Sequence, residues 1–144
     1  MFPRTNPLHV TGSSLLEVLI ALILLSLGML GMISLQVTSL KSNQSAMTRS
    51  LATELTHEIS DLMRANRALA LNGSYDTEFS TAAPSGSSAH AIDLQNWKSR
   101  LAQLPDGKGH IAHNGNQVEI TVQWDESRLR QGDSTQQFSY RTEL

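Results

Sequence analysis

The sequence predicts an α+β protein in which a long N-terminal α-helix, membrane-spanning in its first half, packs on a small domain with a second helix and a three-stranded antiparallel sheet. Residues 18–35 form an uncharged apolar run, a helically spaced apolar pattern follows it, and the last third alternates apolar and polar residues as strands do. The expected parts are a leader at 1–12, a membrane-spanning helix at 13–35, its amphipathic continuation at 36–72, a flexible loop at 73–92 and a globular head at 93–144.

The apolar run is long enough to cross a membrane. Its sequence, VLIALILLSLGMLGMISL, carries no charge, and at the usual helical rise it spans about 27 Å. A buried helix of a soluble domain can be as apolar, but a domain this small has no interior that surrounds such a helix on all sides. Arg4 precedes the run, which favours a cytoplasmic N-terminus, although Lys41 and Arg49 after it weaken the bias. We therefore expect one span with the C-terminal domain outside the cytoplasm.

A second apolar pattern predicts that the helix continues beyond the span. The apolar residues recur at steps of seven, four, four, four and three and so share one stripe: Leu40, Met47, Leu51, Leu55, Ile59 and Leu62. Asn72-Gly73 then offers a left-handed C-terminal cap. If the helix is unbroken from Leu15 to Leu71, it reaches about 85 Å at the usual helical rise. Gly28 and Gly31 are the positions where it could bend.

The remainder of the chain predicts a small head. Residues 80–91, STAAPSGSSAHA, read as an exposed, mobile loop, and Asp93 is the expected N-cap of a second helix that ends at residues 105–107. The apolar residues of this helix share one face: Leu94, Trp97, Leu101 and Leu104.

Three strand-like runs follow the second helix. Ile111 precedes Asn114-Gly115-Asn116, a hairpin turn signal, and residues 118–124 then alternate apolar and polar side chains. Residues 131–133 are the expected turn before a third strand at 135–142. Because a bare three-stranded sheet exposes its apolar face, the sheet should pack on the amphipathic half of the long helix and on the second helix.

Composition excludes several classes of function. The absence of cysteine excludes disulfides and thiolate metal sites, and 11 Lys and Arg against 13 Asp and Glu give no basic excess for nucleic-acid binding. His110 and His113 are spaced for opposite faces of a strand, which disfavours a metal site. No motif joins Ser, His and Asp as in a hydrolase. Trp97 and Trp124 lie on apolar faces and are expected in the core. We expect no enzyme activity, catalytic residue, cofactor or metal.

Glu17 is the residue that most constrains function. An acidic group costs about 2.5 to 3.5 kcal/mol at the centre of a bilayer, and less near one end, where Glu17 lies. A simple explanation is that the Glu17 side chain reaches the lipid headgroups at the cytoplasmic side. A cleavage after Gly12, however, would make Ser13 the first residue, with its amine four residues, about one helical turn, before Glu17. The amine and the carboxylate would then share the membrane edge.

The segment GSSLLEVLIAL at residues 12–22 resembles the class III signal of type IV pilins and pseudopilins. The resemblance implies a pilin-like fold, cleavage by a prepilin peptidase between Gly12 and Ser13 on the cytoplasmic face, N-methylation of Ser13, and a role for Glu17 in subunit registration during assembly. Ser13 replaces the usual phenylalanine or methionine. The chain also lacks the paired cysteines of major pilins and has Ser34 where many major pilins have proline. Both differences argue against a major pilin.

A wider resemblance involves LLEVLIALILLSLGMLGMISLQ at 15–36, the Trp97 helix with LPDGKG at 104–109, and VEITVQW at 118–124. These look like the minor pilins of the PilV group, the type IV pilus modification proteins. That group implies a low-abundance subunit that helps to prime assembly and lies near the pilus tip.

The resemblance also implies where the protein acts and what it meets. The partners would be the prepilin peptidase, other minor pilins, the major pilin, the inner-membrane assembly platform and, before assembly, membrane lipid, with no direct contact to nucleic acid. The location would be the inner membrane and the extracellular pilus of a Gram-negative bacterium. A minor pseudopilin of a type II secretion system, or a simple membrane-anchored extracytoplasmic binding domain, remains an alternative.

Overall fold

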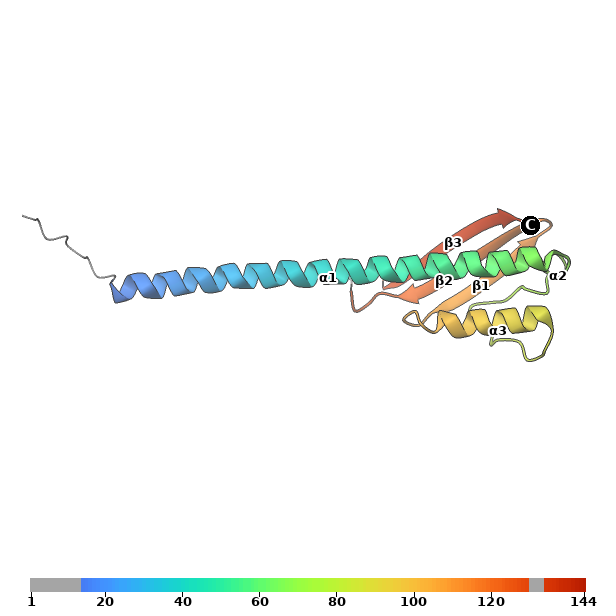
Figure 1. Cartoon of the computed structure of the whole chain (residues 1–144), viewed down its shortest axis with the longest axis horizontal. Coiled ribbons are helices and arrows are strands. Elements are labelled where there is room, and N and C mark those ends of the chain that lie inside the picture. The colour runs from blue at the N-terminus through green and yellow to red at the C-terminus, as the bar shows by residue number, and fades with distance from the viewer. Residues whose placement is uncertain (1–13, 130–133) are drawn as a thin grey trace, which may run out of the picture. The chain divides into compact units, whose positions relative to one another are not determined.

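The structure, a computed structural model, describes residues 14–129 and 134–144 and confirms the expected α+β class (Figure 1). The chain divides into two compact units, Met1–Leu40 and Lys41–Leu144. The elements in chain order are α1 (Leu15–Ala65), α2 (Arg67–Leu71), α3 (Ala89–Leu101), β1 (Lys108–Asn114), β2 (Gln117–Asp125) and β3 (Thr135–Glu143).

The buried face of α1 lies near its C-terminal end. Leu55 and Ile59 are fully buried there, as the apolar stripe predicts, together with Ala52, Thr56, Ser60 and Met63. The helix continues through the whole stripe, but only the later part of the stripe is buried, since Leu40 is 68% exposed and Met47 is 76% exposed. Among the described residues, the core packed on α1 begins at the partly buried Leu51 and the fully buried Ala52, so Leu40 and Met47 lie before it.

The helix is not unbroken to Leu71, because α1 stops before Asn66 and α2 begins after it. Asn66 has φ −113° and ψ 43°, which is not helical. Its side-chain amide donates to Tyr75 Oη at 3.0 Å and to Asp93 Oδ2 at 3.2 Å, and Tyr75 Oη donates to the same Asp93 oxygen at 2.5 Å. This three-residue network connects the helix break with the chain after α2 and with α3.

The cap expected at Asn72-Gly73 is present at the end of α2. Gly73 has φ 77°, and its N–H donates to Ala70 O at 3.1 Å while Ser74 N–H donates to Leu69 O at 3.0 Å. These two hydrogen bonds make a Schellman motif, which requires the left-handed conformation that glycine adopts without strain.

Helix α3 begins five residues earlier than expected, at Ala89, and its N-cap is Ser88 in place of Asp93. Residues 89–91 are compatible with a helix, and Ala91 is buried against the head, which favours the extra turn. The Asp93 carboxylate instead accepts a hydrogen bond from the Tyr75 hydroxyl. The apolar face of α3 is as expected, with Leu94, Trp97 and Leu101 buried.

The segment at 73–92 is not simply a loop. Its last residues belong to α3, Tyr75 is buried in the core, and Thr77 forms a β-bridge with Ile111. Gln95 of α3 donates to Pro84 O at 2.7 Å, and Lys98 donates to Thr77 Oγ1 at 2.7 Å and also to Thr81 O. Side chains of α3 therefore hold this segment at several points.

The three strands form an antiparallel sheet in the order β1-β2-β3. A two-residue connection, Gly115-Asn116, joins β1 to β2, and Gly115 has φ 63°, which suits the first central position of a type II′ hairpin turn. The turn expected at 131–133 lies outside the described residues.

One hydrophobic core joins the sheet, α3 and the C-terminal part of α1. Trp97 and Trp124 are 1% and 3% exposed, which confirms both as core residues. At the rim, Arg100 of α3 forms ion pairs with Glu54 and Glu58 of α1. The sheet, α3 and this part of α1 therefore form a head with its own interior.

Candidate functional site

Glu17 lies in the first turn of α1, and its local geometry follows from a capping serine. The Ser14 hydroxyl oxygen accepts a hydrogen bond from the Glu17 N–H at 3.2 Å, as in the first half of a Ser-x-x-Glu capping box. The Glu17 side chain is exposed, and it takes part in none of the ion pairs among the described residues. A carboxylate at this end of a helix is favoured by the helix dipole. Gly12 and Ser13 lie outside the described residues.

The helix after Glu17 presents apolar side chains on all sides. An 18-residue window of α1 has a mean hydropathy of 2.6, none of it is buried, and it is long and apolar enough to cross a membrane. Exposure of the large side chains reaches 82% at Leu15 and is still 49% at Ile20. A soluble monomer rarely leaves so large an apolar surface uncovered, so this surface suits lipid or other apolar helices.

Two hydroxyl side chains within this part of α1 donate hydrogen bonds to the main chain of the same helix. The Ser26 hydroxyl donates to Leu22 O at 2.7 Å, and the Thr38 hydroxyl donates to Ser34 O at 2.9 Å. Hydroxyls bonded to their own helix can enter an apolar environment without leaving a free donor. Glu17 therefore stands out as the ionisable group at the start of an apolar surface.

His110 and His113 do not combine into one site. His113 Nδ1 lies 2.6 Å from Asp76 Oδ2, and His110 Nε2 lies 3.5 Å from Glu78 Oε2. Each histidine thus faces its own carboxylate on the segment bridged to β1. Within 14–129 and 134–144 no group of three or more His, Cys, Asp or Glu side chains could hold a metal ion.

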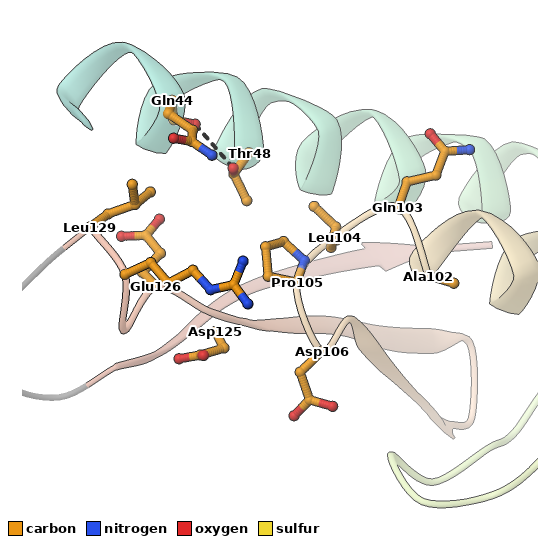
Figure 2. Close-up of a pocket in the computed structure, with 11 residues that line it drawn as sticks. Gln44, Thr48, Ala102, Gln103, Leu104, Pro105, Asp106, Asp125, Glu126 and Leu129 are labelled. Atoms are coloured by element: carbon orange, nitrogen blue, oxygen red, sulfur yellow. Dashed lines mark hydrogen bonds between the residues drawn. The ribbon is translucent and has the colours of Figure 1, made fainter. Parts of the chain in front are cut away.

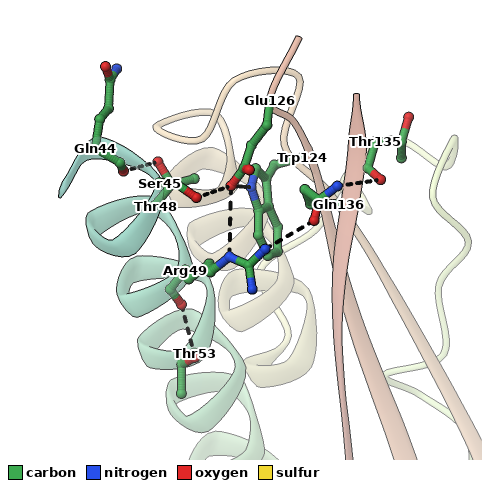
Figure 3. A network of polar contacts seen from close by, with 9 residues as sticks. All are labelled: Gln44, Ser45, Thr48, Arg49, Thr53, Trp124, Glu126, Thr135 and Gln136. Atoms are coloured by element: carbon green, nitrogen blue, oxygen red, sulfur yellow. Dashed lines mark hydrogen bonds and ion pairs between the residues drawn. The ribbon is translucent and has the colours of Figure 1, made fainter. Parts of the chain in front are cut away.

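Glu126 is a buried carboxylate that sequence reasoning missed (Figure 3). It is 1% exposed, and its Oε1 accepts from the Ser45 hydroxyl and from the Trp124 indole N–H, each at 3.0 Å. Arg49 Nε lies 4.0 Å from the same oxygen, and Arg49 Nη2 donates to Gln136 Oε1 at 3.1 Å. No local sequence signal identifies it, because an acidic residue just after a strand usually lies in solvent.

A cavity of about 470 Å³ lies beside Glu126 (Figure 2). It is lined by residues 44 and 48 of α1, residues 102–106 after α3, residue 125 at the end of β2, and residues 126, 128 and 129 after β2. Glu126 is therefore both a structural acceptor and part of a cavity wall.

The chain was compared with protein-family models, curated proteins and solved structures, and none of them matches it. The chemistry of its own residues therefore has to carry any functional conclusion.

Proposed function

We propose that this protein is a minor pilin, a low-abundance structural subunit that helps to prime type IV pilus assembly and is incorporated into the pilus near its tip. The observation that supports this most directly is Glu17 in the first turn of an exposed apolar helix, five positions after Gly12. A capped helix start, an ionisable group and an uncovered apolar surface then occur together.

The proposed mechanism begins at the leader. A prepilin peptidase of the inner membrane cuts between Gly12 and Ser13 and methylates the Ser13 amine. The new N-terminus then lies one helical turn from Glu17. The apolar surface of α1 keeps the subunit in the bilayer until the surface packs against the helices of neighbouring subunits.

Glu17 sets the register of that packing. The carboxylate of an entering subunit pairs with the terminal amine of a neighbour, so that both charges leave the membrane edge as a pair. Such a buried pair need not stabilise an assembly more than apolar residues would, but loss of one partner typically costs about 3 to 5 kcal/mol. The pair therefore acts chiefly to select one arrangement of helices.

The test is the incorporation of Glu17 variants into sheared pili. We expect Glu17→Gln, which keeps size and removes charge, and Glu17→Leu, which increases apolarity, to reduce the amount in the pilus fraction while the inner-membrane amount stays the same. Ser26→Ala is the matched control, because it removes another polar side chain of the same exposed helix surface. Immunoblots of both fractions provide the measurement.

Two other outcomes would favour other functions. Normal incorporation and normal piliation with Glu17→Leu would contradict the proposed register and leave α1 as a simple anchor for an extracytoplasmic binding domain, which needs only apolar length. Co-purification with a type II secretion system in place of pilus subunits would favour a minor pseudopilin, whose leader and apolar helix would be similar.

A further inference from the structure

Strand β3 forms one border of the sheet, and its outer edge has no neighbouring strand among the described residues (Figure 1). On its inner side β3 pairs with β2. The border at β1 differs, because Ile111 exchanges two main-chain hydrogen bonds with Thr77, at 2.9 and 3.0 Å. The described part of the chain therefore covers one border of the sheet in part and leaves the other, along Thr135–Glu143, open.

The two ends of the β2–β3 ladder show which main-chain groups of β3 point away from β2. At one end the Leu144 N–H donates to Asn116 O at 3.0 Å, and at the other end the Glu126 N–H donates to Ser134 O at 2.6 Å. Because hydrogen-bonded and non-hydrogen-bonded pairs alternate in an antiparallel ladder, the even-numbered residues of β3 bond to β2. The odd-numbered residues therefore direct both N–H and C=O outward: Thr135, Gln137, Ser139, Arg141 and Glu143.

The outward groups in the middle of β3 have no protein partner. At the ends, the carbonyls of residues 135 and 143 each accept a hydrogen bond at 3.3 Å from a side chain of the same strand. No hydrogen bond between described residues uses the outward main-chain groups of the exposed central residues: Gln137, Ser139 and Arg141. Their donors and acceptors repeat at every second residue, about 6.7 Å apart, which is the repeat that another extended strand presents.

Strand β3 also lacks the features by which edge strands usually avoid pairing with other chains. Its sequence, TQQFSYRTE, contains no proline or glycine, and its register with β2 runs through all nine residues without a bulge. The two charged side chains, Arg141 and Glu143, both lie in its last third. A long, regular edge of this kind is a ready template for an additional strand.

The side chains of β3 indicate what the added strand would present. Phe138 and Tyr140 lie on the side of the sheet that packs on the core, and both are only partly buried. The ring of His57 in α1 contacts Tyr140 there, with 4.8 Å between ring centroids. Apolar side chains on this side of an added strand would extend the cover over both aromatic rings, while polar side chains would suit the exposed opposite face.

The direction of β3 argues against a second copy of this chain as the partner. Contacts between α1 and β3 occur in the same order along both elements: Arg49 with Gln136, His57 with Tyr140, and Arg64 with Thr142. Symmetric pairing of two β3 strands would be antiparallel and would therefore also reverse one α1 relative to the other. Under the proposed function, on which this step rests, the helices of neighbouring subunits pack in one direction.

We propose that the outer edge of β3 binds an extended segment of a different polypeptide, which adds antiparallel to β3 as a further strand with apolar side chains on the core side. Both existing strand pairings of the sheet are antiparallel as well. The edge lies within Lys41–Leu144 and uses neither Glu17 nor the leader. Binding in detergent is therefore measured separately from incorporation into a pilus, and either can fail without the other.

The test uses the full-length protein in detergent micelles and the peptide acetyl-KVTVTVTVK-amide. With its valines on the core side, its central threonine faces Ser139 and directs N–H and C=O towards β3. N-methylation of this threonine removes a donor at the edge, whereas N-methylation of the adjacent valine removes one that points away. ¹⁵N–¹H spectra measure the hydrogen exchange of the Gln137, Ser139 and Arg141 amides.

We expect these three amides to exchange faster than that of Tyr140 in the free protein, because Tyr140 is bonded to β2. The peptide should slow them saturably by about tenfold or more, as should the valine-methylated peptide. No slowing, or equal slowing by the threonine-methylated peptide, would overturn the proposal. Slowing that rises with protein concentration in the absence of peptide would identify a second copy as the occupant and would overturn it too.

A proline substitution then locates the interaction on the protein. Ser139→Pro removes an outward N–H and leaves the ladder to β2 intact, as prolines of edge strands do. Ser139→Ala is the matched control, because it also loses the hydroxyl that lies 2.9 Å from Thr121 Oγ1 but keeps the N–H. With a fluorescent peptide, Ser139→Pro should weaken binding about tenfold or more, and Ser139→Ala should bind as the wild type does. Wild-type affinity in a folded Ser139→Pro would contradict the proposal, and if this variant does not fold, the two methylated peptides still decide with the wild-type protein.

Discussion

The indole N–H of Trp97 donates a hydrogen bond to the main-chain oxygen of Leu55 at 2.9 Å, across the core between α3 and α1. Both residues are almost completely buried, at 1% and 0% exposure. The contact joins two segments 42 positions apart in the sequence. The C-terminal part of α1 is thus a structural element of the head, with its main chain used as an acceptor by the largest side chain of α3.

Replacement of Trp97 by phenylalanine should destabilise the head. The variant loses the hydrogen bond to Leu55 and leaves a small cavity where the larger ring was, so we expect the free energy of unfolding to fall by about 1 to 3 kcal/mol. Urea unfolding of the full-length protein in detergent, followed by near-ultraviolet circular dichroism, measures the change. Ile92→Val, at a side chain of α3 that is 44% exposed, should change it by less than about 0.5 kcal/mol. Equal midpoints for the two variants would contradict this account of the core.

A second prediction concerns Gly109, which lies against the same indole. A Cβ atom at this position would lie 2.3 Å from Trp97 Cη2 and 2.7 Å from Leu101 Cδ1. Since both neighbours are buried, Gly109→Ala should cost about 1 to 3 kcal/mol through overpacking. Gly31→Ala is the control, because nothing lies within 4 Å of a Cβ there. Thermal unfolding should separate the two substitutions, and an unchanged midpoint for Gly109→Ala would show that the indole can move away.

The main elements of the fold could be predicted because local patterns determine them. Helical spacing identified Leu55 and Ile59, alternation identified the strand from Val118 to Trp124, and the hairpin turn followed from Gly115. The errors occurred where distant residues decide. The break at Asn66 and the role of Asp93 both depend on Tyr75, which no local pattern connects with either of them.

The same distinction between local and distant determinants applies to the residues of the candidate site. Glu17 could be singled out from the sequence because a charge next to an apolar run is a local contrast. Glu126 could not, since an acidic residue near the end of a strand usually lies in solvent. Only the fold shows that Ser45, 81 positions earlier, and Trp124 enclose its carboxylate.

The Tyr75 network predicts a pH dependence of stability. Burial, together with the hydrogen bond to Asp93, raises the pKa of Tyr75 from 10.0 to about 12. Above pH 10 the unfolded chain releases the phenolic proton while the folded chain retains it up to about pH 12. The unfolded state then binds fewer protons, so stability falls as pH rises through this window, by up to about 1.4 kcal/mol per pH unit. Below the window the contribution of Tyr75 is complete.

Tyr75→Phe isolates this contribution. Burial lowers the pKa of Lys98, and hydrogen bonds from Thr142 and Arg64 lower that of Tyr140, so both groups also affect the alkaline range. Lys98 and Tyr140 are present in both the wild type and Tyr75→Phe. The difference between the unfolding free energies of these two proteins should therefore shrink as pH rises from 10 to 12. Urea unfolding at several pH values provides the measurement. A free-energy difference that stays constant would show that folding does not help Tyr75 to retain its phenolic proton.

Processing of the leader is the prediction on which the proposed function depends most. A peptidase that recognises glycine at the cut should reject Gly12→Val, because a branched side chain next to the scissile bond obstructs a site built for glycine. The variant should remain in the inner membrane with residues 1–12 attached, and it should be absent from sheared pili. Intact mass spectrometry distinguishes the two forms, since the processed chain lacks twelve residues and carries one additional methyl group on Ser13. Ser14→Ala, which removes the helix cap near the cut but leaves Gly12, should still be cleaved. A wild-type protein that retains its initiator methionine in the membrane would leave Glu17 without the amine that its proposed role requires.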